Sequence, residues 1–283
     1  MTTTTAPDAA EVYALGTNPA ESARLRRQSD ELRPQAAELL GHIGLRPGQS
    51  AIDLGCGPSG ILDLLSAAVG PGGRVVGLDA DAAHTAMASR YVSGLGLDNV
   101  EVVTADARRT GLPSGRFDLV HGRTLLVTIP DPAEVVTEMV RLARPGGWVA
   151  SQEPDVEHAL CYPPLPAWDR LREILRASFA RSGADVLIGR RLTELFREAG
   201  LEDIQVAVHA PAYQAGHSRR TLLPDLVRSL RPAIVDLGLS DDQELTEVDR
   251  AVREHLADPR TLMMPHLLVA AWGRKPLAPS PVS

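Results

Sequence analysis

The 283-residue sequence contains few cysteines, few aromatic residues and almost no lysine. Cys56 and Cys161 are too few for a disulfide scaffold or a cysteine-rich zinc site, so a reducing compartment, the cytoplasm, is expected. The longest apolar stretch, residues 262–272, contains Pro265 and His266 and is far shorter than the ~20 residues of a membrane span. The amino-terminal letters MTTTTAPDAA include no basic start and no apolar stretch, so no signal peptide is predicted.

Lysine is nearly absent, because Lys275 is the only lysine among 29 basic residues. An excess of arginine can reflect bidentate binding of phosphates or nucleic acid. The net charge is −7, however, and the arginines are interspersed with acidic residues, so a polyanionic partner is not expected. The arginine excess agrees better with the coding bias of a GC-rich genome.

The remaining composition is that of a globular protein. Hydrophobic residues make up 44% and charged residues 23% of the chain, which excludes wholesale disorder. Short apolar segments alternate with segments of helical periodicity. Strands are expected at residues 51–54, 74–78, 100–104, 117–121, 148–152, 204–208 and 267–272. The alternation predicts an α/β fold, a doubly wound sheet covered by helices on both faces.

Helices are also expected outside this core. Residues 21–43 have helical spacing that Pro34 interrupts, which predicts two helices. Two helical segments, near residues 221–230 and 241–256, separate the last two strands. Insertions of this kind commonly form a lid or a substrate wall.

The clearest motif is the glycine-rich turn DLGCGPSG at residues 53–60, between a predicted strand and a helix. Its glycines match the G-x-G-x-x-G fingerprint of dinucleotide-binding proteins. Asp53 would repel a pyrophosphate, because both are anions, but it suits a ligand with an ammonium group. The glycine backbone permits close approach of a ligand, and the following helix N-terminus favours a carboxylate.

Two further acidic residues follow neighbouring strands. Asp79 ends the second strand, where an acid accepts hydrogen bonds from ribose hydroxyls. Asp106 follows the third strand, where it can accept from the exocyclic amine of adenine. The carboxyl ends of parallel strands meet at one edge of a sheet, so these groups are expected to lie together. A ligand with an amino group, a carboxylate and an adenosine is S-adenosylmethionine.

With these motifs the sequence resembles the class I S-adenosylmethionine-dependent methyltransferases over about residues 45–153. The motifs G-L-D, T-A-D-A, F-D-L-V-H-G-R and L-A-R-P-G-G-W-V follow in the family's order. The resemblance implies a Rossmann-like seven-stranded sheet, S-adenosyl-L-methionine as methyl donor and S-adenosyl-L-homocysteine as product. The implied cofactor contacts are Asp53, Gly55 and Gly57 with Gly122 and Arg123 at the methionine end, Asp79 and Ala80 at the ribose, His84, Asp106 and Ala107 at the adenine, and Tyr13 in an N-terminal segment that closes over the cofactor.

The resemblance also divides the chain into a core and added segments. The predicted divisions are a leader with cap helices at residues 1–44, the cofactor-binding core at 45–153, a substrate-cap segment at 154–188, a core helix and strand at 189–218, a helical lid insertion at 219–260, and a closing strand with tail at 261–283.

A catalytic base is needed only if the methyl acceptor must lose a proton. His158 is the leading candidate, because it follows the fifth strand on the ligand side of the sheet. Glu153 shares that edge and is expected to orient His158 or to contact substrate. His121, at the end of the fourth strand, is expected to form a structural hydrogen bond. No metal site is predicted, because no compact cluster with ligand spacing occurs in the sequence.

The sequence therefore predicts an enzyme that methylates a small molecule. Its capped layout resembles quinone-methylating enzymes and actinomycete natural-product methyltransferases, which weakly favours carbon of an aromatic or prenylated metabolite. Oxygen and nitrogen acceptors stay open. The alternatives are an NAD(P)-dependent oxidoreductase, which Asp53 and the single lysine disfavour, and a non-catalytic S-adenosylmethionine-binding module. Neither nucleic acid nor a membrane is an expected partner, and the N-terminal helices could mediate a homo-oligomer.

Overall fold

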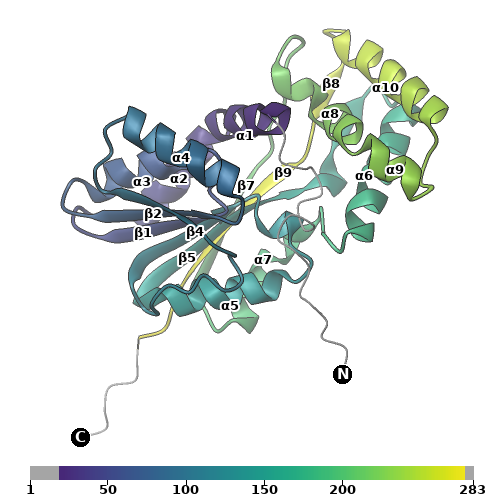
Figure 1. Ribbon diagram of the computed structural model, residues 1–283. Coiled ribbons are helices and arrows are strands. Elements are labelled where there is room, and N and C mark those ends of the chain that lie inside the picture. The colour runs from purple at the N-terminus through teal and green to yellow at the C-terminus, as the bar shows by residue number, and fades with distance from the viewer. Residues whose placement is uncertain (1–18, 278–283) are drawn as a thin grey trace, which may run out of the picture.

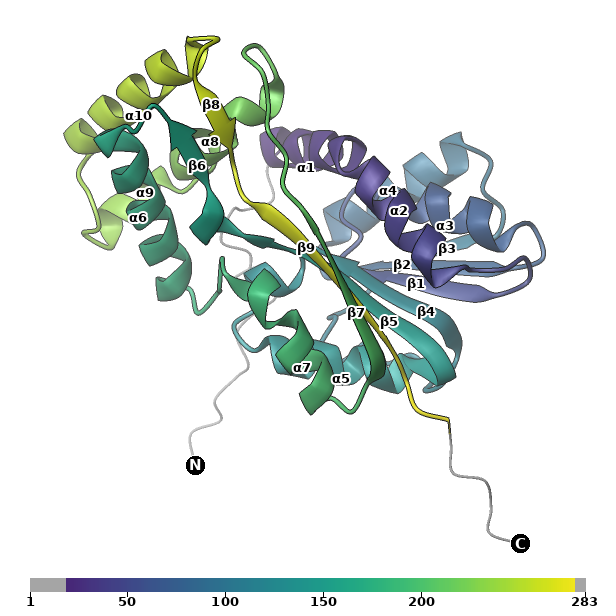
Figure 2. The ribbon, with the colours of Figure 1, turned by 180° about the vertical axis from the view of Figure 1, so that it is seen from behind.

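The computed structural model describes residues 19–277, which form a seven-stranded sheet with helices on both faces and a helical lobe beside it (Figure 1). The strands are β1 (Ser50–Leu54), β2 (Arg74–Asp79), β3 (Val100–Thr104), β4 (Phe117–Arg123), β5 (Ala143–Asp155), β7 (Glu202–His209) and β9 (Leu267–Arg274). Their order is β3-β2-β1-β4-β5-β9-β7. Strand β9 pairs antiparallel with both β5 and β7, and Figure 2 shows it between them. The predicted doubly wound α/β fold is confirmed.

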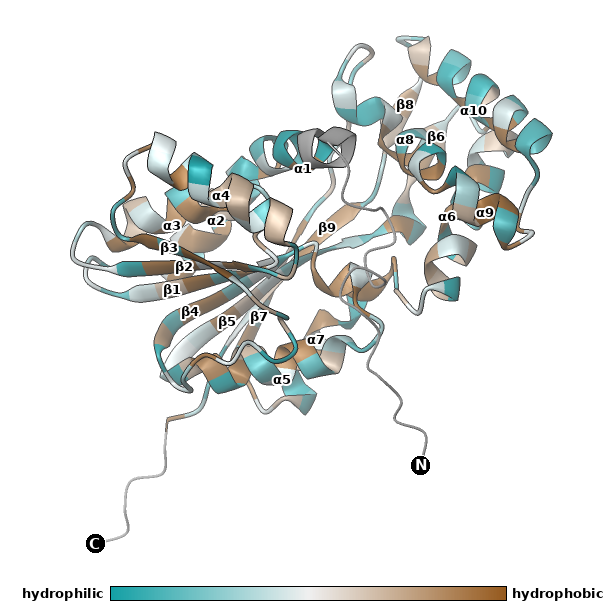
Figure 3. Cartoon of the chain, in the orientation of Figure 1, coloured by the Kyte–Doolittle hydropathy of each residue, from teal (hydrophilic) through white to brown (hydrophobic). Residues whose placement is uncertain are grey.

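Two layers of helices bury the two faces of the sheet. Helices α2 (Arg33–Ile43), α3 (Leu62–Val69) and α4 (Ala82–Gly94) cover one face, and α5 (Pro132–Leu142) and α7 (Leu192–Glu198) cover the other. Successive side chains of a strand point to opposite faces. Ala51 therefore packs with the first layer, whereas Ile52 and Leu54 pack with the second. The hydropathy colouring agrees, with apolar strands and amphipathic covering helices (Figure 3).

Helix α1 (Pro19–Glu31) precedes α2, so the predicted break is confirmed. Pro34 lies in the first turn of α2, where its missing N–H is not needed. Ser29 near the end of α1 donates a hydrogen bond to the carbonyl of Gly60 at 2.6 Å. This contact holds α1 against the glycine-rich turn at the carboxyl edge of the sheet.

The lobe beside the sheet is a helical cap. It consists of α6 (Pro166–Arg181), α8 (Leu222–Ser229), α9 (Arg231–Asp236) and α10 (Asp242–Ala257), with a small sheet of β6 (Leu160–Tyr162) and β8 (Leu262–Met264). Helix α6 packs against α8 and α10, so segments before and after the last core helix meet in one lobe. Short 3-10 helices lie at Leu126–Thr128, Val156–His158, Ile188–Arg191 and Ser218–Thr221.

The cap differs from the sequence prediction in the number of its helices. The lid contains three helices instead of two, because a short helix begins at Arg231 with Pro232 in its first turn. Helix α10 is capped by Asp241, whose carboxylate accepts from the Glu244 N–H.

Candidate active site

The glycine-rich turn after β1 forms the floor of a cavity of about 380 Å³. Gly55, Gly57 and Gly60 all have positive φ values, of 65°, 56° and 52°. A Cβ atom on Gly60 would lie 2.2 Å from the Asp53 Oδ2, so this position requires glycine. The predicted turn is therefore present, and Gly55 and Gly57 line the cavity.

Asp53 is 3% exposed and lines the same cavity. Its Oδ1 lies 2.7 Å from the His121 Nδ1, and its Oδ2 accepts from the Ile61 N–H at 3.0 Å. His121 thus makes the expected structural contact. The two bonds fix a carboxylate at the edge of the cavity, where it can also accept hydrogen bonds from an ammonium group.

Arg123 brings a cation to the same cavity. Its guanidinium donates to the Ser29 Oγ at 2.9 Å and to the Leu32 carbonyl at 3.3 Å. Burial lowers the pKa of Arg123, and the Asp53 carboxylate partly raises it again. Gly122, which precedes Arg123 in β4, is buried under Leu125. The cavity thus carries an anion and a cation, the pair that an amino acid moiety requires.

Asp79 connects the end of β2 to the glycine-rich turn. Its Oδ2 accepts from the Gly57 N–H at 2.8 Å and its Oδ1 from the Asp81 N–H at 2.9 Å. The buried His84, in the first turn of α4, has its Nδ1 3.6 Å from the Asp79 Oδ1. Ala80 is exposed beside them. The structure brings these predicted ribose and adenine contacts together, but none of them lines the cavity.

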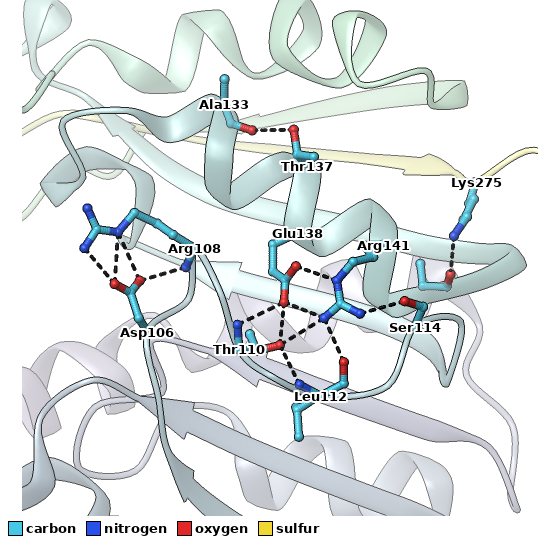
Figure 4. Close-up of polar contacts among 11 residues, drawn as sticks. Asp106, Arg108, Thr110, Leu112, Ser114, Ala133, Thr137, Glu138, Arg141 and Lys275 are labelled. Carbon is cyan, nitrogen blue, oxygen red and sulfur yellow. Dashed lines mark hydrogen bonds and ion pairs between the residues drawn. The ribbon is translucent and has the colours of Figure 1, made fainter. Parts of the chain in front are cut away.

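Asp106 has a partner that the sequence reading missed. Arg108 holds it through both guanidinium and backbone N–H donors, at 2.6–3.1 Å (Figure 4). The Arg108 hydrogen bonds keep the pKa of Asp106 below its ordinary value. The neighbouring Ala107 is buried. An acid two residues before an arginine in a turn is the signal that could have revealed this pair.

Glu153 is fully buried and lines neither of the cavities described here. Its carboxylate accepts from the N–H groups of Leu125, Leu126 and Val127 at 3.0–3.1 Å, and from the Ser151 hydroxyl. Burial raises the pKa of Glu153 to about 7, although these hydrogen bonds act in the opposite direction. These hydrogen bonds hold the turn after β4, and a catalytic role for Glu153 stays a prediction.

A second, larger cavity of about 680 Å³ lies between α1, the cap and the end of β5. Most of its wall is apolar, formed by Leu25, Leu32, Val127, Pro154, Val156, Leu175, Phe179, Val186, Leu222, Leu223 and Leu226. Its polar lining residues are Arg24, Gln28, Thr124, Thr128, Arg219 and His266. Leu25, Gln28 and Thr124 line both cavities, so the two adjoin beneath α1.

His158 does not reach this second cavity. It is exposed at the end of the 3-10 helix Val156–His158, and only Val156 of that turn lines the wall. No hydrogen bond between His158 and Glu153 occurs in the described part of the chain. A catalytic role for His158 stays a prediction. The histidine that the structure brings to the cavity is His266, together with Arg219, and no local motif marks either of them.

Two aromatic residues that follow the core of β5, Tyr162 and Trp168, line neither cavity. Tyr162 is 62% exposed, and Trp168 is buried in the core of the cap. Tyr13 lies outside the described residues. Within residues 19–277, no group of three or more histidine, cysteine or acidic side chains is arranged to hold a metal ion. Over the same range, every helix is too short or too polar to cross a bilayer.

Comparison with known proteins identifies relatives of the chain. A family profile described as a methyltransferase domain matches residues 24–206. An uncharacterized protein in transposon TN4556 of Streptomyces fradiae is 34% identical over 173 residues, which are 61% of this chain and 49% of that protein. The chain thus spans about half of that relative's length.

Two further relatives are named methyltransferases. A demethylmenaquinone methyltransferase of Bacillus cytotoxicus is 29% identical over 181 residues, which are 60% of this chain and 76% of the relative. Nocamycin O-methyltransferase of Saccharothrix syringae is 34% identical over 122 residues, which are 43% of this chain and 44% of the relative.

Solved structures show the same fold. An S-adenosylmethionine-dependent methyltransferase of Aquifex aeolicus aligns with a TM-score of 0.53 and 16% identity over 90% of this chain and 98% of its own. Phosphoethanolamine N-methyltransferase 2 of Haemonchus contortus, solved in complex with S-adenosylmethionine, aligns with a TM-score of 0.55 and 17% identity over 87% of this chain and 53% of its own. The chain belongs to the methyltransferase domain family, and its fold is that of the class I S-adenosylmethionine-dependent enzymes.

Proposed function

We propose that the protein transfers a methyl group from S-adenosylmethionine to a small, largely apolar acceptor. The two adjoining cavities are the observation that carries this proposal. One has the glycine-rich turn and the charged pair Asp53 and Arg123, and the other has an apolar wall. Leu25, Gln28 and Thr124 line both, so a donor and an acceptor would meet at these residues.

The residues of the first cavity fit the methionine end of the cofactor. Asp53 would accept hydrogen bonds from its ammonium group, and Arg123 would donate to its carboxylate. When bound, S-adenosylmethionine supplies a methyl group on a positively charged sulfur, and a nucleophile that attacks the methyl carbon displaces S-adenosylhomocysteine. Helix α1, held by the Ser29 bond to Gly60, would exclude water from the site.

The ribose and adenine contacts belong to the same proposal. Asp79 and Ala80 would meet the ribose at the end of β2. His84 and Ala107 would pack near the adenine, and Asp106 would accept from its amine. Because Arg108 already donates to Asp106, the carboxylate would share its oxygens between the guanidinium and the adenine.

For the acceptor we propose carbon of an aromatic or prenylated metabolite. The apolar wall of the second cavity supports such a molecule, since burial of apolar surface is the main favourable term in binding. Methylation at oxygen is the alternative, and the likeness to nocamycin O-methyltransferase supports it. An oxidoreductase is disfavoured, because Lys275 donates to the Ala143 carbonyl and lines neither cavity.

Calorimetry with S-adenosylhomocysteine tests the cofactor assignment. Asp79→Ala is expected to weaken binding by about 1–3 kcal/mol, the scale of hydrogen bonds to a charged group. Asp169→Ala, an exposed acid in the first turn of α6, is the matched control and should bind like the wild type. Unchanged affinity in Asp79→Ala would remove Asp79 from the site. A wild-type protein that binds S-adenosylmethionine but forms no S-adenosylhomocysteine from it, with any of a panel of apolar acceptors, would be a non-catalytic binding module.

A further inference from the structure

One end of the apolar cavity carries a buried cation and a buried imidazole. Arg219, in the 3-10 helix Ser218–Thr221, is 3% exposed, and His266, directly before β9, is 6% exposed. Both line the cavity. The charge of Arg219 acts on His266 and also on Arg123, which lines the cofactor cavity.

The guanidinium of Arg219 has donors to spare. It donates one hydrogen bond, to the Glu31 Oε2 of α1 at 3.1 Å. Its Nε is buried without a hydrogen-bond partner among the described residues. A buried donor without a partner is unfavourable, so its presence at a cavity indicates a contact that a ligand completes.

His266 complements this donor as an acceptor. Its ring forms no hydrogen bond with any group of residues 19–277. Burial, reinforced by the nearby charges of Arg219 and His209, lowers the pKa of His266 to about 3. The imidazole is therefore neutral at physiological pH, with one ring nitrogen able to accept a proton. The other titratable or charged groups near the pair include Glu31 and Arg24 from α1, Arg123 from β4, His209 from β7, and Tyr213.

We propose that Arg219 and His266 bind and ionise a weakly acidic hydroxyl, a phenol or an enol, on the apolar methyl acceptor. This inference rests on the proposed function and names its substrate class. As the hydroxyl O–H bond breaks, its proton forms an N–H bond with the His266 ring and the electron pair stays on the oxygen. The negative charge on that oxygen favours the imidazolium, against the burial and the Arg219 charge that otherwise lower the pKa of His266. The Arg219 guanidinium donates to the resulting oxyanion, which activates that oxygen and the carbon conjugated with it.

The pairing favours a hydroxyl over a carboxylate. A hydroxyl donates to one partner and accepts from another, which matches one imidazole acceptor and one guanidinium donor. A carboxylate at neutral pH can only accept, and Arg219 alone would satisfy it. The unprotonated nitrogen of His266 has no donor to accept from in such a ligand.

The test uses 4-nitro-1-naphthol, whose ionised form has its own visible absorption band, bound to the full chain without cofactor. Binding is expected to lower the pKa of the probe hydroxyl, so that the bound probe ionises at a proton concentration at least about tenfold higher than the free probe does. Arg219→Gln and His266→Gln should each abolish most of this change, and Arg219→Lys should retain part of it. The matched controls are His255→Gln, in α10, and Arg260→Gln, after α10. Neither residue lines a cavity, so both variants should retain the full change in ionisation.

The inference is overturned if the probe does not bind, or if it ionises as in free solution. It is also overturned if the change in ionisation survives both Arg219→Gln and His266→Gln, or if His158→Gln removes the change and His266→Gln does not. Arg219→Gln loses the hydrogen bond to Glu31 and could fail to fold for that reason. In that case the test of the inference depends on His266→Gln and Arg219→Lys. Calorimetry of the same proteins with S-adenosylhomocysteine separates the two proposals. A wild type that binds S-adenosylhomocysteine but leaves the probe unchanged contradicts only this inference, whereas a wild type that ionises the probe but does not bind S-adenosylhomocysteine contradicts only the proposed function.

Discussion

Single acidic residues at the site differ in role because their surroundings differ. Asp53 and Glu153 are both buried near the carboxyl ends of central strands. Asp53 lines the cofactor cavity and meets a histidine, whereas Glu153 is enclosed by backbone N–H groups and a serine hydroxyl. Both are acids near the carboxyl end of a strand, so their surroundings distinguish an acid that lines a cavity from one that is enclosed by the chain.

Glu153→Gln is expected to change stability in a pH-dependent way. Burial raises the pKa of Glu153 from 4.5 to about 7, so its protonated form contributes stability that is present below about pH 4.5 and lost as the pH rises through about 7. The free energy of unfolding of the wild type should therefore fall by about 2–3 kcal/mol relative to the variant between about pH 5 and about pH 8. Urea titrations of both proteins at the two pH values measure this change. A difference between them that is independent of pH would show that Glu153 has no raised pKa.

The residues predicted for the methionine end meet in one cavity, and sequence could bring them together because a glycine-rich turn and an acid after a strand are local patterns. Asp53, Gly55, Gly57 and Arg123 all line the first cavity. The polar end of the second cavity could not be predicted. Arg219 and His266 lie far apart in the sequence and meet only because the cap folds back over the sheet edge.

At the scale of elements, hydrogen bonds to side chains fix the loops between the strands. The loop after β3 is tied to α5 through Glu138, which accepts from the N–H and hydroxyl of Thr110 and from Arg141 (Figure 4). Arg141 in turn donates to the Leu112 carbonyl and to Ser114. This cluster holds the chain that carries Asp106 and Ala107 against the sheet.

Glu138→Gln should loosen that loop. The Arg141 hydrogen bond lowers the pKa of Glu138 from 4.5 to about 2, so its carboxylate contributes stability that is present above about pH 4.5 and lost as the pH falls through about 2. At neutral pH the variant is expected to lose about 1–3 kcal/mol of unfolding free energy. The loss should shrink on acidification, opposite in sign to the trend for Glu153→Gln. Chemical denaturation between about pH 7 and about pH 3 checks this, and a loss that grows in acid would rule the account out.

Most strands and helices could be predicted, because apolar runs and helical spacing are local properties. Strand pairing is not local. Nothing in residues 267–272 indicates that β9 lies antiparallel between β5 and β7, since this order depends on contacts across the whole chain. The three-residue strands β6 and β8 are too short to produce a periodic signal.

At the scale of the whole molecule, Arg220 connects the parts of the cap. It is buried and donates to four carbonyls, those of Tyr213, Leu256, Asp258 and Thr261, at 2.6–3.1 Å. These carbonyls come from the segment after β7, the end of α10 and the turn before β8. One side chain therefore joins the entry and the exit of the lid, which also carries Arg219 and part of the apolar wall.

Arg220→Gln is expected to destabilise the cap more than the sheet. The loss should be at least about 3 kcal/mol, because several carbonyls lose a charged donor at once. Hydrogen exchange should rise in residues 213–221 and 256–264 and stay unchanged in β1, β2 and β4. Arg260→Gln, with a side chain that is 87% exposed, is the control and should change neither. Equal acceleration over the sheet and the cap would show that the two unfold as one unit.

The central claim is that donor and acceptor occupy separate cavities that adjoin at Leu25, Gln28 and Thr124. A crystal structure of the full chain with S-adenosylhomocysteine tests it most directly. The predicted result places the amino acid end of the ligand between Asp53 and Arg123, with its sulfur directed toward the shared wall and the apolar cavity free for an acceptor. A ligand bound within the apolar cavity, or with its sulfur directed away from that wall, would contradict the claim.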